Sequence, residues 1–149
     1  MKRLLCLVIA LFVLFGIAIA EDQTVWVLCQ PDSYVNIRSR PSGRSDTVGY
    51  ADCGEAFDTD GVSKNGFLHV YASVENGEGW ISKGYLVYEK PTFISRKMTV
   101  SGRGRVNARK TINGKRRCWV KPGDVVTVYW IAEWAVTSKG FIKTEYLAD

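Results

Sequence analysis

The stretch SYVNIRSRPSGRSDTVGYADCG, residues Ser33 to Gly54, decides the fold class. An apolar-alternating run ends in Asn36-Ile37-Arg38, breaks at a Pro-Ser-Gly loop, and resumes as a second alternating run that stops at Gly54. Alternation with a period of two indicates a half-buried strand, and Pro and Gly punctuate turns. The stretch therefore predicts two adjacent strands joined by a loop, with Gly54 in a sharp turn that a Cβ would obstruct.

The same pattern continues along the chain, and helical periodicity is absent after residue 20. Asn76-Gly77 is a strong hairpin signal because both residues tolerate positive φ. Pro91 marks a seam, since proline cannot donate to a sheet ladder. The predicted fold class is all-β, with short strands at 24–29, 34–38, 47–51, 55–59, 67–72, 79–82, 92–100, 105–109, 116–120, 125–130, 134–137 and 140–143.

The two halves of the chain align as an internal repeat. Val35-Asn36-Ile37-Arg38 matches Val106-Asn107-Ala108-Arg109, and the turn Cys53-Gly54-Glu55 matches Pro122-Gly123-Asp124. A closing Gly-aromatic-Ile, three residues and Tyr-Leu occurs in both halves, and the hairpin before it is shortened in the second copy. The repeat predicts two small β-barrels in tandem.

The first twenty residues read as a secretory signal peptide. A basic start, an apolar core and a small-residue ending at Ala18-Ile19-Ala20 predict cleavage before Glu21. The alternative is an uncleaved anchor, although the apolar run is at the short limit of a membrane span. We therefore divide the chain into a signal peptide (1–20), an acidic first barrel (21–90) and a basic second barrel (91–149), and expect a secreted, envelope-associated protein.

Charge is distributed unequally between the two predicted barrels. Residues 21–90 carry a net charge of −5, whereas residues 91–149 carry +8. A change of sign of this size indicates two units with different partners, or two units that attract one another.

Together these motifs resemble the bacterial Src-homology-3-like (SH3b) domain family. The resemblance rests on Val-Asn-x-Arg, the Pro-Ser loop, Val48-Gly49, Asn65-Gly66-Phe67 and the closing Gly-Trp-Ile-x-x-x-Tyr-Leu. It covers nearly all of residues 24–88 and is weaker over 94–147, where Ala108 replaces an aliphatic residue and no Pro-Ser loop follows. The resemblance implies a ligand groove on the loop-rich side of the first barrel, lined by Tyr34, Asn36, Tyr50 and Tyr85.

Three cysteines remain after the predicted cleavage. In an exported chain a pair is expected to be bridged, and Cys29 and Cys53 lie at the edges of neighbouring predicted strands. We predict a Cys29–Cys53 disulfide, with Cys118 left as a small apolar side chain. No Cys-x-x-Cys spacing supports a zinc or thioredoxin-type site.

The sequence offers no catalytic constellation, and we expect a protein that is not an enzyme and needs no metal or cofactor. The single histidine, His69, alternates with Leu68 and Val70, and no second base is evident to orient it. SH3b domains often accompany cell-wall cysteine peptidases of the NlpC type, but such a catalytic domain would need residues that this chain lacks. Asp58-Thr59-Asp60-Gly61 begins like a calcium loop, but the twelfth position is histidine, which favours a β-turn.

The second half contains a long basic tract, with no acidic residue between Glu89 and Asp124. A solvated face is the simple explanation, but eleven cations without an anion exceed what solubility needs. No aromatic residue falls between Phe93 and Trp119, which argues against a base-stacking nucleic-acid platform. We predict an anion-binding surface composed of Arg103, Arg105, Arg109, Lys110, Arg116 and Arg117.

Two functions fit these observations. The first is a non-catalytic extracellular binding module that attaches to peptidoglycan or to an anionic envelope polymer. The second is a protein–protein adaptor or inhibitor of a secretion, transfer or wall-remodelling system.

Overall fold

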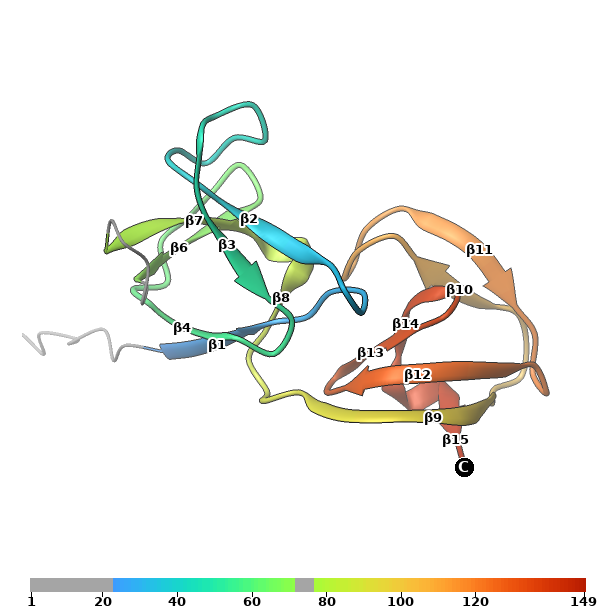
Figure 1. Ribbon diagram of the computed structural model, residues 1–149. Helices are drawn as coiled ribbons and strands as arrows, with labels where there is room; N and C mark the ends of the chain where they lie inside the picture. The colour runs from blue at the N-terminus through green and yellow to red at the C-terminus, as the bar shows by residue number, and fades with distance from the viewer. Residues whose placement is uncertain (1–22, 72–76) are drawn as a thin grey trace, which may run out of the picture.

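The computed structural model describes residues 23–71 and 77–149, and in these residues it consists of β-strands and two single-turn 3-10 helices (Figure 1). The strands form two separate antiparallel sheets, which confirms an all-β fold of two small units. No helix in these two ranges is long and apolar enough to cross a membrane. The predicted signal peptide, its cleavage site and Asn76 of the predicted hairpin lie outside the described residues.

The first unit contains eight strands and one 3-10 turn, and its sheet has the order β3-β2-β7-β6-β4-β1-β8, with β5 paired to β6. The elements are β1 (Gln23–Val27), β2 (Tyr34–Arg38), β3 (Thr47–Asp52), β4 (Ala56–Thr59), β5 (Ser63–Lys64), β6 (Phe67–Tyr71), β7 (Glu78–Ser82), η1 (Lys83–Tyr85) and β8 (Leu86–Val87).

The second unit follows after a connection of four residues, and its sheet has the order β11-β10-β14-β13-β12-β9-β15. This order matches the first sheet element by element, with β2 equivalent to β10 and β3 to β11, as the internal repeat predicts. The elements are β9 (Thr92–Val100), β10 (Val106–Arg109), β11 (Arg116–Val120), β12 (Val125–Ile131), β13 (Trp134–Thr137), β14 (Gly140–Lys143), η2 (Thr144–Tyr146) and β15 (Leu147–Ala148).

The repeated glycine turns show how closely the two units correspond. Gly54 and Gly123 both adopt positive φ, at 86° and 91°. The Gly54 amide donates to the Val27 carbonyl at 2.7 Å, and the Gly123 amide donates to the Val100 carbonyl at 2.8 Å. Because a positive φ strains residues that carry a Cβ, glycine at both positions is a requirement of the turn.

Each unit has its own core, built by the alternation seen in the sequence. In β2, Val35 and Ile37 are buried while the two polar residues between and after them remain partly accessible. Arg38 closes the loop that follows by donating from Nη1 to the Ser45 carbonyl at 2.9 Å. Its repeat equivalent, Arg109, donates from Nη1 to the Gly114 carbonyl at 2.8 Å. The Asn-x-Arg motif therefore ends a strand and fastens the next loop in both units.

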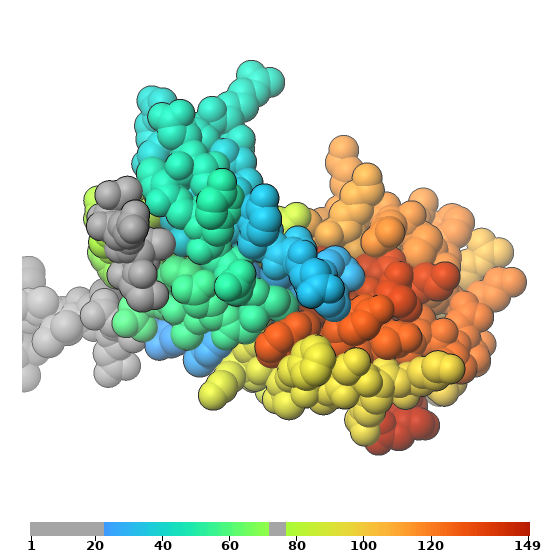
Figure 2. Space-filling view, viewed as in Figure 1, coloured from blue at the N-terminus to red at the C-terminus, as the bar shows by residue number. Residues whose placement is uncertain are grey.

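A third apolar cluster joins the two units. Leu28 and Val87 of the first unit are buried together with Trp134, Val136 and Phe141 of the second. The backbone also bridges the junction, where the Ile112 amide donates to the Gly84 carbonyl at 2.8 Å. In the space-filling view the segment between β1 and β2 (blue) rests against the orange-red part of the second unit (Figure 2).

This junction differs from the electrostatic attraction that the charge distribution suggested. Every ion pair among the described residues lies within a single unit. Apolar area removed from water is favourable without any directional requirement. Exposed opposite charges are screened by salt and contribute little. The two units are therefore joined by apolar packing.

The two repeated glycines provide a matched test of this junction. A Cβ on Gly54 would lie 2.8 Å from Cη2 of Trp130 in the second unit, whereas a Cβ on Gly123 has no neighbour within 4 Å. Gly123→Ala should cost roughly 1–2 kcal/mol of unfolding free energy, from the positive φ alone. Gly54→Ala should cost about 1–3 kcal/mol more, because the added methyl group overpacks the junction. Chemical unfolding of the three proteins checks this, and equal costs for the two variants would contradict it.

Candidate functional site

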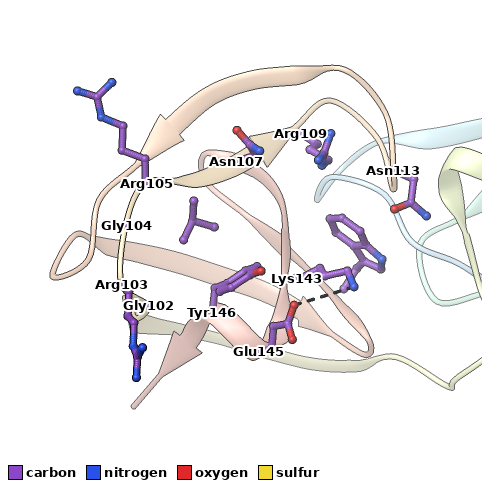
Figure 3. Close-up of a pocket in the computed structure, with 12 residues that line it drawn as sticks. Gly102, Arg103, Gly104, Arg105, Asn107, Arg109, Asn113, Lys143, Glu145 and Tyr146 are labelled. Carbon is purple, nitrogen blue, oxygen red and sulfur yellow. Dashed lines mark ion pairs between the residues drawn. The ribbon is translucent and has the colours of Figure 1, made fainter.

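The second unit has a basic cleft, which we define as the cavity lined by residues 102–107, Arg109, Asn113, Trp134, Lys143, Glu145 and Tyr146. Its volume is about 320 Å³, at the small end of the range for ligand pockets. Asn107, Arg109 and Tyr146 surround the hollow, while Arg103 and Arg105 stand on its rim with their side chains directed outward (Figure 3). The cleft is thus large enough for a small ligand or for part of a larger one.

Local contacts hold the inner cations in place. Arg109 is anchored by its hydrogen bond to the Gly114 carbonyl. Lys143 lies between the ring of Trp134, at 5.9 Å from Nζ to the centroid, and the Glu145 carboxylate at 4.0 Å. Of the described residues, Glu145 is the only acidic one that lines the cleft. The cleft therefore retains a net positive charge.

The predicted anion-binding residues lack acidic partners. Within the described residues of the second unit, the two ion pairs are Arg96 with Asp149 at 2.7 Å and Lys143 with Glu145. Neither pair involves any of the six cations predicted from the sequence. The structure brings Arg103, Arg105 and Arg109 together around the cleft and places Arg116 beside Arg105 through a shared aromatic ring. Lys110 and Arg117 do not line the cleft.

The shared ring belongs to Trp119, and we call Arg105, Trp119 and Arg116 the Trp119 stack. Cζ of Arg116 lies 3.9 Å from the ring centroid and Cζ of Arg105 lies 5.1 Å from it. Half of the Trp119 surface remains exposed. The stretch between Phe93 and Trp119 contains no aromatic residue, but β11 folds back beside β10 and brings Trp119 itself among the arginines.

A β-bulge creates this stack. Ala108 pairs with Cys118 but Arg109 pairs with Arg116, so Arg117 is an extra residue in β11. In a regular strand, residues three apart lie on opposite faces. The extra residue places Arg116 and Trp119 on the same face. The sequence carried one signal of this arrangement, since Trp119 lies four residues before the Gly123 turn as Tyr50 lies four residues before the equivalent Gly54 turn.

A neutral amide side chain also lines the cleft. Oδ1 of Asn107 is buried and has no hydrogen-bond partner among the described residues. A buried acceptor left unpaired costs free energy. Figure 3 shows the Asn107 oxygen directed away from the hollow and its amide nitrogen toward it, and sequence reasoning did not single out Asn107.

The structure divides the groove predicted for the first unit. Tyr34 and Tyr50 are exposed and stack edge to face, with ring centroids 4.7 Å apart, and Asn36 pairs with Tyr50 across β2 and β3. Tyr85 does not join them. It packs 6.3 Å from the Phe141 ring of the second unit, because the apolar junction covers this side of η1.

The repeat carries these groove positions into the basic cleft. Counted from the matching Asn-x-Arg motifs, Tyr34 corresponds to Arg105 and Asn36 to Asn107, while the strand pairing relates Tyr50 to Trp119. Tyr85 corresponds to Tyr146, which lines the cleft and is 37% exposed. All four equivalents belong to the basic cleft or to the Trp119 stack. The predicted set of positions is thus assembled in the second unit rather than the first.

The predicted disulfide is absent from the structure, where Cys29, Cys53 and Cys118 are all free thiols. Cys29 and Cys53 are nevertheless in contact, since the Cys29 amide donates to Sγ of Cys53 at 3.0 Å. A hydrogen bond from the Cys29 thiol lowers the pKa of the Cys53 thiol. The same contact, burial and the nearby charges of Cys53 and Asp52 raise the pKa of Cys29. The two thiols are therefore adjacent but unbonded, with the Cys29 thiol donating to the Ser33 carbonyl at 3.4 Å and the Cys53 thiol to the Cys29 carbonyl at 3.1 Å.

His69 has more partners than the sequence indicated. Its Nδ1 lies 3.1 Å from Oδ2 of Asp60 and its Nε2 lies 3.6 Å from Oε2 of Glu78. The expectation that no second group orients His69 was therefore wrong, because the turn after β4 brings Asp60 beside β6. With a carboxylate at each ring nitrogen, the imidazole is held between two acids. In residues 23–71 and 77–149 no group of three or more potential ligands is placed to hold a metal ion.

Comparisons with known proteins give no family assignment. No family model and no curated protein matches the chain. Solved structures that resemble it include NlpC1 from Trichomonas vaginalis (14% identity, 87% of this chain, TM-score 0.39) and NlpC2 from Trichomonas vaginalis (15% identity, 89% of this chain, TM-score 0.36). The chain spans 46% and 49% of their lengths. Likeness at this level says nothing about what this chain binds or does.

The contact between Cys29 and Cys53 predicts that oxidation joins them. The new bond would close a loop of about 25 residues and stabilise the fold by about 3.5 kcal/mol in the chain-entropy model. Cys118 should stay reduced, because its Sγ lies against the Lys139 carbonyl in the second unit. Peptide mapping without reductant, before and after mild oxidation, checks the pairing. Recovery of Cys29 linked to Cys118, or of both first-unit thiols still free after oxidation, would contradict it.

The Asp60 contacts predict a small pH dependence of stability. Burial acts to raise the pKa of Asp60, but hydrogen bonds from the Val62 amide, the Tyr71 hydroxyl and His69 together hold it below its ordinary value of 3.8. With a depressed folded-state pKa, the ionised carboxylate contributes stability above pH 3.8 and loses it as the pH falls through the folded-state value. Wild type should therefore exceed Asp60→Asn in unfolding free energy at neutral pH, and the difference should shrink in acid. Unfolding titrations between about pH 2 and 7 test this, with exposed Asp46→Asn as control.

Proposed function

We propose that the protein is a secreted binding module that attaches to an anionic polymer of the cell envelope through the basic cleft and the Trp119 stack. The proposal takes the tandem SH3b resemblance as its fold family and assigns no catalytic step to the chain. The first unit is the partner that supports the second through the apolar junction.

The observation that carries the proposal is the lack of acidic partners around a preformed hollow. None of Arg103, Arg105, Arg109 and Arg116 has a carboxylate within ion-pair distance among the described residues. A solubility surface needs no cavity and is normally interspersed with both signs of charge. Cations gathered around a cleft instead raise the local concentration of an anionic ligand.

The chemistry of the cleft narrows the class of ligand. Guanidinium groups match phosphate and carboxylate geometry and bind them in a bidentate manner. Asn107 also lines the cleft and adds a side-chain amide that can donate to a ligand oxygen. The exposed half of the Trp119 surface adds an apolar contact of the kind that dominates binding energy at interfaces. A polyol phosphate or an acidic glycan supplies all of these groups.

We predict that reversal of charge at the cleft abolishes binding. In the cleft variant, Arg103, Arg105 and Arg116 are changed to Glu. In the matched control, Arg40, Arg44 and Lys64 of the first unit, which are likewise exposed, are changed to Glu. Both variants shift net charge by the same amount, so a general charge effect would weaken both equally. Co-sedimentation with sacculi that retain or lack their anionic polymer measures binding, and only the cleft variant should lose it.

Salt provides the second readout. Removal of one cation that pairs with a phosphate should reduce the slope of log K against log salt by about 0.7–0.9. Equal weakening of binding in both variants would contradict the proposal, and so would binding that is unchanged when the anionic polymer is removed.

Single-stranded DNA of equal charge serves as the competing ligand. Tighter binding to DNA, together with strong dependence on Trp119, would reveal a base-stacking site in place of a polymer site.

A further inference from the structure

A second cavity lies between the two units, and we call it the inter-unit cleft. Its volume is about 670 Å³, within the range of small-molecule sites. The first unit contributes Asp32, Tyr34 and Asp52, and the second contributes Phe93, Tyr129 and Trp130. Because the apolar junction fixes the two units against one another, this cleft is a permanent feature of the tandem.

Aromatic pairs from both units border the inter-unit cleft. Tyr34 stacks edge to face on Tyr50, and Phe93 stacks edge to face on Trp130 at 5.2 Å between ring centroids. Tyr34 and Phe93 are each 59% exposed. Large aromatic side chains left this accessible on facing units are available to contact a ligand.

Charge distinguishes this cavity from the basic cleft. Asp32 and Asp52 line it, and none of the described Lys, Arg or His residues does. Neither carboxylate accepts a hydrogen bond from another side chain in residues 23–71 and 77–149. The repeat makes the contrast direct, because Asp32 and Tyr34 occupy the positions of Arg103 and Arg105. The same loop therefore presents acid and aromatic groups in one unit and cations in the other.

The backbone that borders the cavity is irregular. Strands β1 and β4 pair in regular register. Their equivalents β9 and β12 contain a β-bulge, because Val128 pairs with Arg96 but Trp130 pairs with Phe93, which shifts the register between the two pairs. This bulge holds Ser95 at a φ of 41°, and Asp32 across the cavity has a φ of 56°. Non-glycine residues at positive φ carry a conformational cost and cluster at functional sites. The bulge directs Phe93 and Trp130 to the inter-unit cleft.

We propose that the inter-unit cleft binds an organic ammonium group, such as the side-chain amine of a peptide, between the Asp32 and Asp52 carboxylates and the faces of Tyr34 and Phe93. A cation is attracted electrostatically both by the carboxylates and by the aromatic faces. A neutral sugar has no charge and receives neither attraction. The site is independent of the basic cleft, which would attract the opposite charge. Since both carboxylates are exposed, a single amine should bind weakly, and affinity would come from repetition along a larger ligand.

The test uses the full exported chain and three probes. Nα-acetyl-L-lysine amide carries the ammonium group, Nα,Nε-diacetyl-L-lysine amide lacks it, and tri-N-acetylchitotriose represents a neutral sugar. Two-dimensional ¹H–¹⁵N spectra follow the indole N–H of Trp130 and the amides of the cleft. The charged lysine probe should shift these signals in a saturable manner, and the diacetyl probe should not.

Variants assign the effect to the cleft. Asp32→Asn with Asp52→Asn should weaken binding by about fivefold for each carboxylate, the size of an exposed ion pair. Asp46→Asn with Glu89→Gln makes the same change of charge at exposed positions elsewhere and should have no effect. Phe93→Ala should weaken binding without any change of charge, which separates the aromatic contribution.

Three outcomes would overturn the proposal. Chitotriose binding that persists in the Asp32→Asn/Asp52→Asn variant would make the cavity a sugar site. Equal weakening of lysine-probe binding by Asp46→Asn with Glu89→Gln would show that the effect comes from net charge alone. No shift of the Trp130 indole signal with the lysine probe would leave the cleft without this ligand. None of these results bears on the basic cleft, whose test uses different residues and an anionic probe.

Discussion

The apolar junction between Tyr85 and Phe141, extended by Leu28, Val87, Trp134 and Val136, is the contact on which the inter-unit cleft depends. Without it, Phe93 and Trp130 would not face Asp32 and Tyr34, and the inter-unit cleft would not exist. The junction also partly buries Tyr85, while its equivalent Tyr146 is more exposed and lines the basic cleft. One packing interaction thus makes the two copies of a repeated position differ in exposure.

Duplication followed by divergence at a few loop positions accounts for the two cavities. The strand order, the glycine turns and the Arg-to-carbonyl hydrogen bonds are the same in both units. The positions that differ project from this common frame, where exposed substitutions cost little stability. Arg105 beside Trp119 and Tyr34 beside Tyr50 show how one pair of positions can carry opposite chemistry.

Much of the fold could be predicted from the sequence because period-two alternation and turn residues are local signals, and the strands at 92–100 and 116–120 have the predicted bounds. The two-residue strands were missed, since two residues show no period. The bulge at Arg117 was also missed, because strand register depends on the pairing partner. The candidate site was harder to predict from the sequence for the same reason. Clustered arginines could be read directly, but only the sheet order brings Trp119 and Lys143 beside them from other strands.

Rigid docking has a consequence for any ligand that carries both signs of charge. Four residues connect β8 to β9, too few to let the units separate widely while the apolar cluster stays buried. A flexible tandem could adapt the spacing of its two clefts to many partners, whereas this tandem offers one spacing. Simultaneous engagement then raises the effective concentration at the second cleft only for a ligand whose charges match that spacing. If both clefts bind as we propose, the apolar junction that creates the inter-unit cleft would also select between polymers of different repeat length.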